Sequence, residues 1–462
     1  MAWRPIALCA LILAIPRTGL AQEVAAPAPA AEATARKDHL VPLFDIVVFD
    51  VLLNRYGRQL IDRGTYDVGA SSIRRNLHSA WVIDSDPFAT NQFMHPYQGA
   101  MYHGFARSAG LNYWESLGYT FAGSALWEIA GETTLPSKND QIASGIGGSF
   151  LGEPLFRIAN VVLEKANRLP GFWRELTAAV ISPAMGFNRL AYGERFKAVF
   201  PSHSPAFFVR VQFGATATGS IQKSFRRSFT AHEGVADFSI DYGLPGVSDY
   251  AYRRPFDYFN FQFTSSKTNL FENIFTRGLL AGRGYGSGET GHRGVWGLYG
   301  TYDYVAPQVF RASSTALAFG TTFQRRIFGP SALQSTVLAG VGYGAAGTIH
   351  ETGARDYHYG LTPQILVANR LNLGDRASFD LTLRDYYVSG IASTEPGGFE
   401  KVARADGLLT FRLGKHQAVS ARYIWSRRAA ASPGFDNFIQ SQGSFGLFYA
   451  YLTGSRFGAV AW

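Results

Sequence analysis

The chain has 462 residues, of which 47% are hydrophobic, 15% aromatic and 17% charged, and its formal net charge at pH 7 is +9. Its mean hydropathy of −0.03 would by itself indicate an ordinary soluble protein. Cys9 is the only cysteine, so disulfides and cysteine-ligated metals are excluded from the rest of the chain.

The first residues have the features of a secretory signal peptide. Arg4 precedes an apolar run over residues 6–15, and Gly19-Leu20-Ala21 suits signal peptidase. We therefore predict that residues 1–21 are removed on export, and Cys9 with them. Residues 22–39 are rich in Ala and Pro and hold no pattern able to bury a core, so we predict a disordered leader.

Residues 40–200 are predicted to form a mainly α-helical domain, because apolar residues recur with a period near 3.6. The expected helices cover residues 44–62, 98–108, 113–131, 138–165 and 171–189. His95-Pro96 is expected to form a turn, since proline disfavours helix in the preceding residue. Residues 111–131 are as apolar as a membrane helix, but Glu115 and Glu128 make membrane insertion unfavourable, so we interpret this segment as a core helix.

The densest polar group of the chain lies within this helical region. Its members, in chain order, are Asp86-Pro87-Phe88, Asn91-Gln92, His95-Pro96-Tyr97, Gly99, Tyr102, Ala106-Arg107-Ser108, Trp127-Glu128, Glu132, Pro136-Ser137-Lys138-Asn139-Asp140, Gly147-Gly148 and Gly152-Glu153. In order and spacing they resemble the bacterial family called domain of unknown function 3943. The resemblance implies a shared N-terminal module and a location in the cell envelope. It implies no reaction, so function has to be argued from the residues.

Glu128 and Glu132 are four residues apart and would share one helix face. One hypothesis makes them an acid/base or metal pair completed by His95 or His103, because carboxylates held together separate their pKa values. The other makes them a buried structural pair, bonded to Arg107 or Asn139. The two histidines lack a metal-ligand spacing, so we predict neither a metal nor a cofactor.

Further residues are candidates for binding or for structure. His103 and Arg107 are four apart and form a donor-rich face that suits phosphate or carboxylate, unless Arg107 neutralises a glutamate internally. The ligand-binding candidates are Tyr102, His103, Arg107, Asn139 and Asp140. The structural candidates are Ser137 as a helix cap, Gly148 and Gly152 as a close-packing pair, Glu153 with Arg157 as an intrahelical ion pair, and the terminal aromatic Trp462.

Residues 201–462 are predicted to form an antiparallel transmembrane β-barrel of about 12 strands. On residues 378–384, Phe379, Leu381 and Leu383 alternate with polar side chains, as expected for a strand between lipid and a polar lumen. The chain also has 23 Tyr, 8 Trp and 50 Gly, which suit aromatic girdles, strand packing and turns. The final stretch contains a Thr453-Gly454-Ser455 break, so ten or fourteen strands are alternatives, and a soluble β-sandwich is the competing fold.

We therefore predict a mainly β membrane protein of the outer membrane, with an N-terminal helical domain that could act as a plug. Its role would be structural, or transport and binding of a ligand that the sequence does not name. The alternative is an envelope hydrolase or lipid-modifying enzyme that uses His95, Glu128 and Glu132. The expected partners are outer-membrane lipid, lipopolysaccharide and the outer-membrane assembly machinery, whereas nucleic acid is not expected for an exported chain. The sequence leaves the oligomeric state open.

Overall fold

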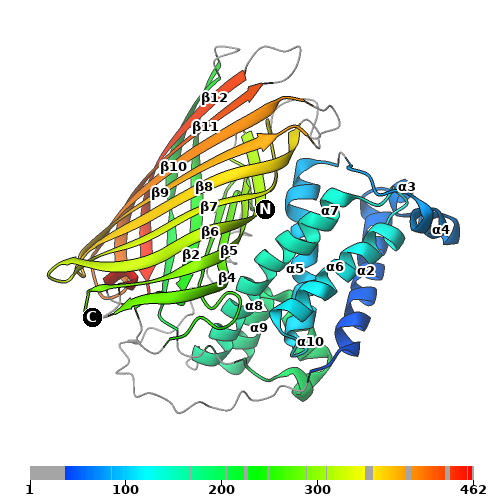
Figure 1. Cartoon of the computed structure of the whole chain (residues 1–462), viewed down its shortest axis with the longest axis horizontal. Coiled ribbons are helices and arrows are strands. Elements are labelled where there is room, and N and C mark those ends of the chain that lie inside the picture. Colours follow the sequence, from blue (N-terminus) through cyan, green and yellow to red (C-terminus); the bar gives the residue numbers. More distant parts are fainter. Residues whose placement is uncertain are drawn as a thin grey trace. The chain divides into compact units, whose positions relative to one another are not determined.

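The computed structural model describes residues 37–84, 86–166, 169–200, 202, 205–222, 227–246, 250–287, 289–307, 310–348, 357–391, 397–431, 438–454 and 456–459. The predicted signal peptide, most of the predicted leader and Trp462 lie outside these residues. The chain divides after Ser202 into two compact units, one helical and one a β-barrel (Figure 1).

The first unit is built from α-helices and two short π-helical turns. The elements are α2 (Leu40–Leu60), α3 (Arg63–Tyr66), α4 (Ala70–His78), the π-turn η1 (Thr90–Met94), α5 (His95–Ser108), α6 (Tyr113–Ala130), α7 (Lys138–Ile142), the π-turn η2 (Ala143–Gly147), α8 (Gly148–Lys165), α9 (Gly171–Ile181), α10 (Pro183–Ala191) and the 3-10 turn η3 (Gly193–Phe196). None of the described helices has both the length and the apolar content needed to cross a membrane.

Local sequence signals explain several helix ends. Asn112 caps α6 by accepting from the backbone N–H groups of Trp114 and Glu115, and the Glu115 carboxylate accepts from the Asn112 N–H in return. Ser137 caps α7 by accepting from the Asp140 N–H, as the sequence predicted. Ser182 separates α9 from α10 because it precedes Pro183, which disfavours a helical conformation in the residue before it.

The single helix predicted over residues 171–189 is therefore two helices. The predicted turn at His95-Pro96 was also wrong. His95 has helical dihedral angles and directly continues the π-turn η1, and Pro96 lies in the first turn of α5. The sequence also gave no sign of the short helices α3 and α4.

Helices α5 and α8 approach each other at glycines. A Cβ atom added to Gly148 would lie 2.5 Å from the Cα atom of Gly99, and one added to Gly152 would lie 3.1 Å from the Cα atom of Ala100. Side chains larger than hydrogen would separate the two backbones. The small-residue spacing of Gly148 and Gly152 thus allows close contact with a second helix, as expected for a close-packing pair.

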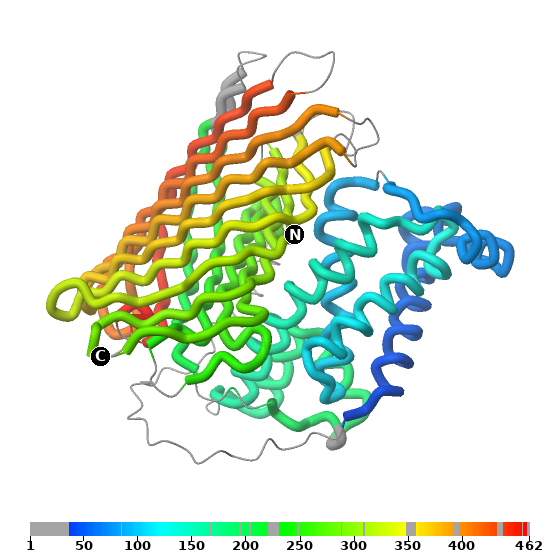
Figure 2. The backbone as a smooth tube through the Cα atoms, in the orientation of Figure 1, coloured from blue at the N-terminus to red at the C-terminus, as the bar shows by residue number. Residues whose placement is uncertain are grey.

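The second unit is a closed antiparallel barrel of twelve strands, each paired with its sequence neighbour, and β1 with β12 (Figure 2). The strands are β1 (Phe207–Gln222), β2 (Arg227–Tyr242), β3 (Phe259–Ser266), β4 (Asn273–Ser287), β5 (His292–Val305), β6 (Phe310–Phe328), β7 (Ser331–Thr348), β8 (Tyr357–Leu373), β9 (Ala377–Ser389), β10 (Phe399–Arg412), β11 (Gln417–Ala431) and β12 (Phe438–Leu452). The predicted barrel and its strand number are confirmed, and the last strand ends at Leu452.

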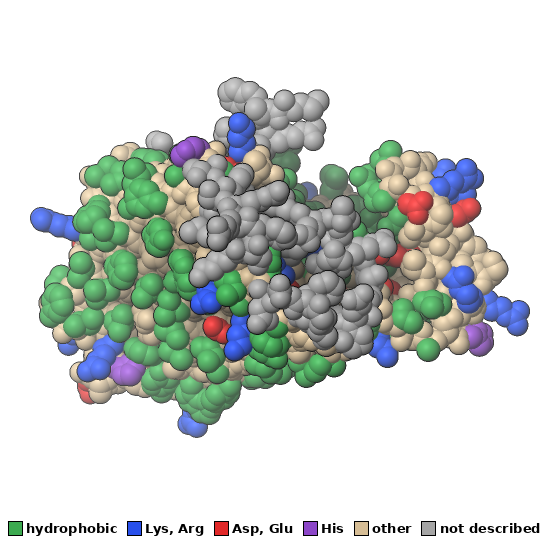
Figure 3. Space-filling view, turned by 90° about the horizontal axis from the view of Figure 1, so that it is seen from above, with side chains coloured by type: hydrophobic (Ala, Val, Ile, Leu, Met, Phe, Trp, Pro, Cys, Tyr) green, Lys and Arg blue, Asp and Glu red, His purple; other side chains and the backbone are tan. Residues whose placement is uncertain are grey.

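The barrel wall has an apolar outer face and a polar inner face. On β9, the side chains of Phe379 and Leu383 are exposed, whereas the intervening Asp380 bonds to arginines within the barrel. On β11, the exposed Tyr423 and the buried Arg422 show the same alternation. Apolar side chains are spread widely over the outer surface of the barrel (Figure 3). An exposed apolar face of this extent is unstable in water and suits the hydrocarbon of a membrane.

Candidate functional site

The predicted site residues fall into three separate groups within the helical unit. His95, Glu128 and Asp140 come together in the first group, and Glu132 is close enough to act on His95 and Glu128 through its charge. His103 and Arg107 belong to a second group around Glu153, and Tyr102 to a third group with Asp50. The single site that the sequence suggested is thus divided.

The first group is a buried cluster of one histidine and several carboxylates. His95 begins α5, Glu128 lies near the end of α6, and Asp140 lies in α7. These three residues are 4%, 5% and 2% exposed, and one ligand atom from each can be chosen so that all three atoms lie within 4.8 Å of one another. They are therefore the described residues best placed to hold a metal ion.

Neighbouring polar groups fix the orientation of this cluster. The Ser137 N–H donates to Glu128 Oε2 at 2.8 Å, and the Asn139 side-chain amide donates to Asp84 at 2.6 Å and to Asp140 at 3.3 Å. Val82 and Ser137 form a β-bridge that brings the segment before η1 alongside the start of α7. The cluster is therefore held by backbone pairing as well as by side chains.

The electrostatics of the cluster favour its neutral forms. Burial raises the pKa of Glu128 and of Asp140 well above the usual range, and neighbouring carboxylates raise both further. Burial lowers the pKa of His95, although nearby carboxylates act in the opposite direction. Among the described residues, no Lys or Arg forms an ion pair with Asp84, Glu128 or Asp140, so no such side chain stabilises the ionised form of these carboxylates.

Glu128 and Glu132 do not share one helix face, contrary to the prediction. Helix α6 ends at Ala130, and Glu132 lies beyond it. Its Oε1 atom accepts from the Trp127 indole N–H at 2.5 Å, and its Oε2 atom accepts from the Thr134 hydroxyl at 3.0 Å. These local hydrogen bonds of Glu132 stabilise the end of α6.

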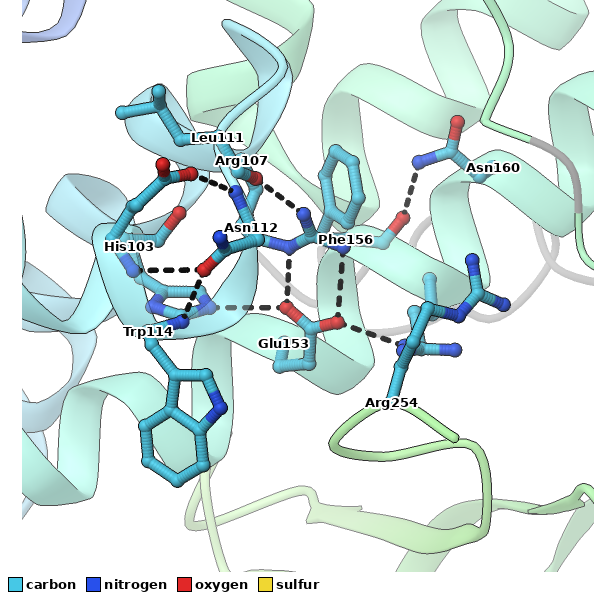
Figure 4. Close-up of polar contacts among 12 residues, drawn as sticks. His103, Arg107, Leu111, Asn112, Trp114, Glu153, Phe156, Asn160 and Arg254 are labelled. Atoms are coloured by element: carbon cyan, nitrogen blue, oxygen red, sulfur yellow. Dashed lines mark hydrogen bonds and ion pairs between the residues drawn. The ribbon is translucent and has the colours of Figure 1, made fainter. Parts of the chain in front are cut away.

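The second group is a buried ion cluster in which a single carboxylate binds three basic side chains (Figure 4). Glu153 of α8 accepts from His103 Nε2 at 3.0 Å, from Arg107 Nε at 2.7 Å and from Arg157 Nε at 2.8 Å. Arg107 also donates to the Leu111 carbonyl at 2.5 Å and lies over the Phe156 ring. The donor-rich face of His103 and Arg107 therefore binds a carboxylate of its own chain.

Charge pairing dominates this second group. Burial by itself would raise the pKa of Glu153, but the Arg107 and Arg157 guanidiniums hold it well below its usual range. Burial lowers the pKa of His103. Arg157 is four residues from Glu153 in α8, so the predicted intrahelical ion pair is present. Glu153, rather than Glu128 or Glu132, is the glutamate that Arg107 neutralises.

The third group contains a residue that the sequence analysis missed. Tyr102 donates to Asp50 Oδ1 of α2 at 2.5 Å and accepts from the Gln98 amide at 2.6 Å. Burial raises the pKa of Asp50 to about 8. A carboxylate among the apolar residues of the first helix was the available signal, because a carboxylate on a buried helix face needs a partner.

The barrel lumen carries a charged network that the sequence analysis also left unassigned. Arg370 of β8 donates to Asp241 of β2 at 2.8 Å and to Asp380 of β9 at 2.5 Å. Arg422 of β11 donates to Asp406 at 2.5 Å and to Asp237 of β2 at 3.1 Å. Two cavities of about 550 and 610 Å³, counted with open solvent, lie within this network. The sequence signal for this charged network was the presence of charged residues at inward-facing strand positions.

Comparison with known proteins supports the family resemblance of the helical unit. Residues 80–184 match the model of the family described as domain of unknown function (DUF3943). This range contains all three residues of the first group and the whole Glu153 cluster. No curated protein matches the chain.

The described barrel, with its apolar outer face and polar lumen, defines the chain as an integral β-barrel of the outer-membrane type with an N-terminal helical region. Among solved structures it is similar to OmpT with loop L8 deleted, an outer-membrane protein of Vibrio cholerae, at 10% identity, 54% of this chain, 99% of that chain and a TM-score of 0.21. It is also similar to an anion-selective porin from Comamonas acidovorans, at 7% identity, 54% of this chain, 100% of that chain and a TM-score of 0.21.

Proposed function

We propose that this protein resides in the outer membrane, reached through a cleaved signal peptide, and that its barrel is a closed anchor for a helical domain with a structural or ligand-binding role. Outer-membrane lipid, lipopolysaccharide and the outer-membrane assembly machinery are the partners this location implies. The observation that carries the proposal is the pairing of Arg370 with Asp241, because β8 and β2 stand opposite each other in the closed strand order.

A second feature of the barrel also supports a closed lumen. The 3-10 turn η4 (Arg456–Gly458) places Phe457, which is fully buried, against Phe208 of β1. The Gly458 carbonyl accepts from the Gln324 amide of β6 at 2.9 Å. The chain segment after β12 thus reaches from β1 to β6 across the barrel interior. These groups belong to the barrel unit alone, so closure does not require the helical domain to act as a plug.

Planar-bilayer conductance of the full chain tests this proposal. We expect the wild-type protein to show little steady current, because ion pairs and the buried η4 turn obstruct the lumen. Arg370→Ala removes both links from β8 to its partners and should raise the mean conductance several-fold. Arg427→Ala, which removes an exposed arginine on β11, is the matched control and should leave the current unchanged. A large steady conductance of the wild-type protein would refute the closed-anchor proposal.

The enzyme alternative requires a substrate to reach His95, Glu128 and Glu132. His95 and Glu128 are almost fully buried, and Glu128 Oε2 is already occupied by the Ser137 N–H. A general acid or base must come within hydrogen-bond reach of the substrate. The burial of these side chains therefore favours an internal role for the cluster over acid/base catalysis.

A further inference from the structure

We propose that His95, Glu128 and Asp140 bind one divalent transition-metal ion of the Zn²⁺ or Mn²⁺ type inside the helical domain. This inference goes beyond the proposed function, since a closed barrel anchor needs no metal. An imidazole nitrogen combined with carboxylate oxygens is a ligand set for such ions, whereas Ca²⁺ and Mg²⁺ prefer oxygen ligands alone. The ligand atoms of the three residues already lie within 4.8 Å of one another.

An unsatisfied carboxylate oxygen is the second observation that points to a ligand. Glu128 is 5% exposed, and its Oε1 atom has no hydrogen-bond partner among the described residues, although Oε2 is bonded to the Ser137 N–H. A buried polar atom without a partner costs about 1–3 kcal/mol, and more when it carries charge. A metal ion at the centre of the cluster would satisfy this atom.

The two buried clusters differ in how their carboxylates are neutralised. Glu153 is neutralised by Arg107 and Arg157. Asp140 and Glu128 have no such partner among the described residues, and Asp84 lies beside them, because the Asn139 amide donates to both aspartates. Buried carboxylates persist in proteins when they are paired or coordinate a metal.

The surrounding structure is suited to orient metal ligands. His95 directly follows the π-turn η1, and Asp140 lies in the short helix that leads into the π-turn η2. Single π-helical turns occur frequently at functional sites. The Ser144 hydroxyl of η2 lies 3.5 Å from His95 Nδ1, and His95 Nε2 lies 3.7 Å from Asp140 Oδ2. A hydrogen bond to one ring nitrogen directs the other toward a metal.

The burial of the three ligands makes this a closed, structural type of site. The expected result of metal binding is therefore a more stable helical domain. We expect the detergent-purified full chain, stripped with a chelator and dialysed against Zn²⁺ or Mn²⁺, to retain about one ion per chain. The midpoint of thermal unfolding of its helical signal should fall on stripping and return on reloading.

Two isosteric variants and a matched control test the ligand assignment. Glu128→Gln and Asp140→Asn should each weaken metal binding at least tenfold. Glu132→Gln is the control, because Glu132 is only four residues from Glu128 and bonds to Trp127 and Thr134 instead. Because Glu132 acts on the cluster through its charge and not as a ligand, this variant should weaken metal binding far less than either ligand variant. Equal binding by Glu128→Gln and Glu132→Gln would overturn the assignment, as would a folded wild-type protein that retains neither ion.

Zinc X-ray absorption of the wild-type protein reads the ligand set without any substitution and applies even if the variants fail to fold. We expect one imidazole nitrogen and at least two carboxylate oxygens at about 2.0–2.2 Å. A spectrum with only water ligands, or with two or more imidazoles, would overturn the proposal. Metal content and conductance are independent, so failure of this site would leave the closed-anchor proposal standing.

Discussion

Replacing Glu153 with Gln should lower the free energy of unfolding of the helical domain by about 3–5 kcal/mol, the range for removing one partner of a buried ion pair. The Glu153 carboxylate accepts from His103, Arg107 and Arg157. A neutral amide cannot offset two buried guanidiniums, so their desolvation would no longer be compensated. Urea unfolding of the full chain, followed by the helical circular dichroism signal, measures the change.

The matched control is an exposed ion pair in the same domain. Arg58 and Asp67 are 2.7 Å apart, with side chains 34% and 52% exposed. Exposed pairs contribute about 0–1 kcal/mol, so Asp67→Asn should have little effect. If Glu153→Gln were no more destabilising than Asp67→Asn, the cluster around Glu153 would not be an element of stability.

Gly99→Ala should destabilise the helical domain by about 3 kcal/mol or more, at the upper end of the cost of overpacking. A Cβ atom at Gly99 would lie 1.9 Å from the backbone oxygen of Ser144 in η2. Neither atom belongs to a flexible side chain, so α5 and η2 would have to separate. The change would also move Ser144 relative to His95. Thermal unfolding of the helical signal measures the loss.

Gly118→Ala is the matched control in the same domain and should have the opposite effect on stability. Gly118 lies within α6, is exposed, and has nothing within 4 Å of an added Cβ atom. Alanine is the better helix former by about 1 kcal/mol, so this variant should be slightly more stable than the wild-type protein. Destabilisation by both substitutions to the same extent would show that close packing at Gly99 is not the cause.

The barrel was the part of the fold that the sequence predicted best. Successive side chains of a strand point to opposite faces. In a membrane barrel one face contacts lipid and the other contacts a polar lumen, so apolar and polar residues alternate in the sequence. The faces assigned to Phe379, Leu381 and Leu383 follow directly from this alternation. The cross-barrel pairing of Arg370 with Asp241 was not predictable, because strand periodicity gives the face of a residue but not the residue opposite.

In the helical domain, the sequence did not predict which candidate side chains come together. His95, Glu128 and Asp140 were each named as candidates, but nothing in their spacing placed Asp140 rather than Glu132 beside Glu128. That arrangement depends on α6 ending at Ala130 and on the two π-turns, which have no sequence signature. Arg107 pairs with Glu153 because α5 and α8 meet at Gly99 and Gly148, a contact between distant segments that local periodicity does not contain.

The measurement that tests the account most directly is the accessibility of spin labels along β9 in a lipid bilayer. Single cysteines placed in turn at residues 378–384 would each carry a label, and the exported protein should hold no other thiol, because Cys9 lies in the predicted signal peptide. We predict high collision with lipid-dissolved oxygen at 379, 381 and 383, and low collision at the positions between them. Uniform accessibility, or strong collision with a water-soluble reagent at Phe379 and Leu383, would contradict a membrane-embedded barrel.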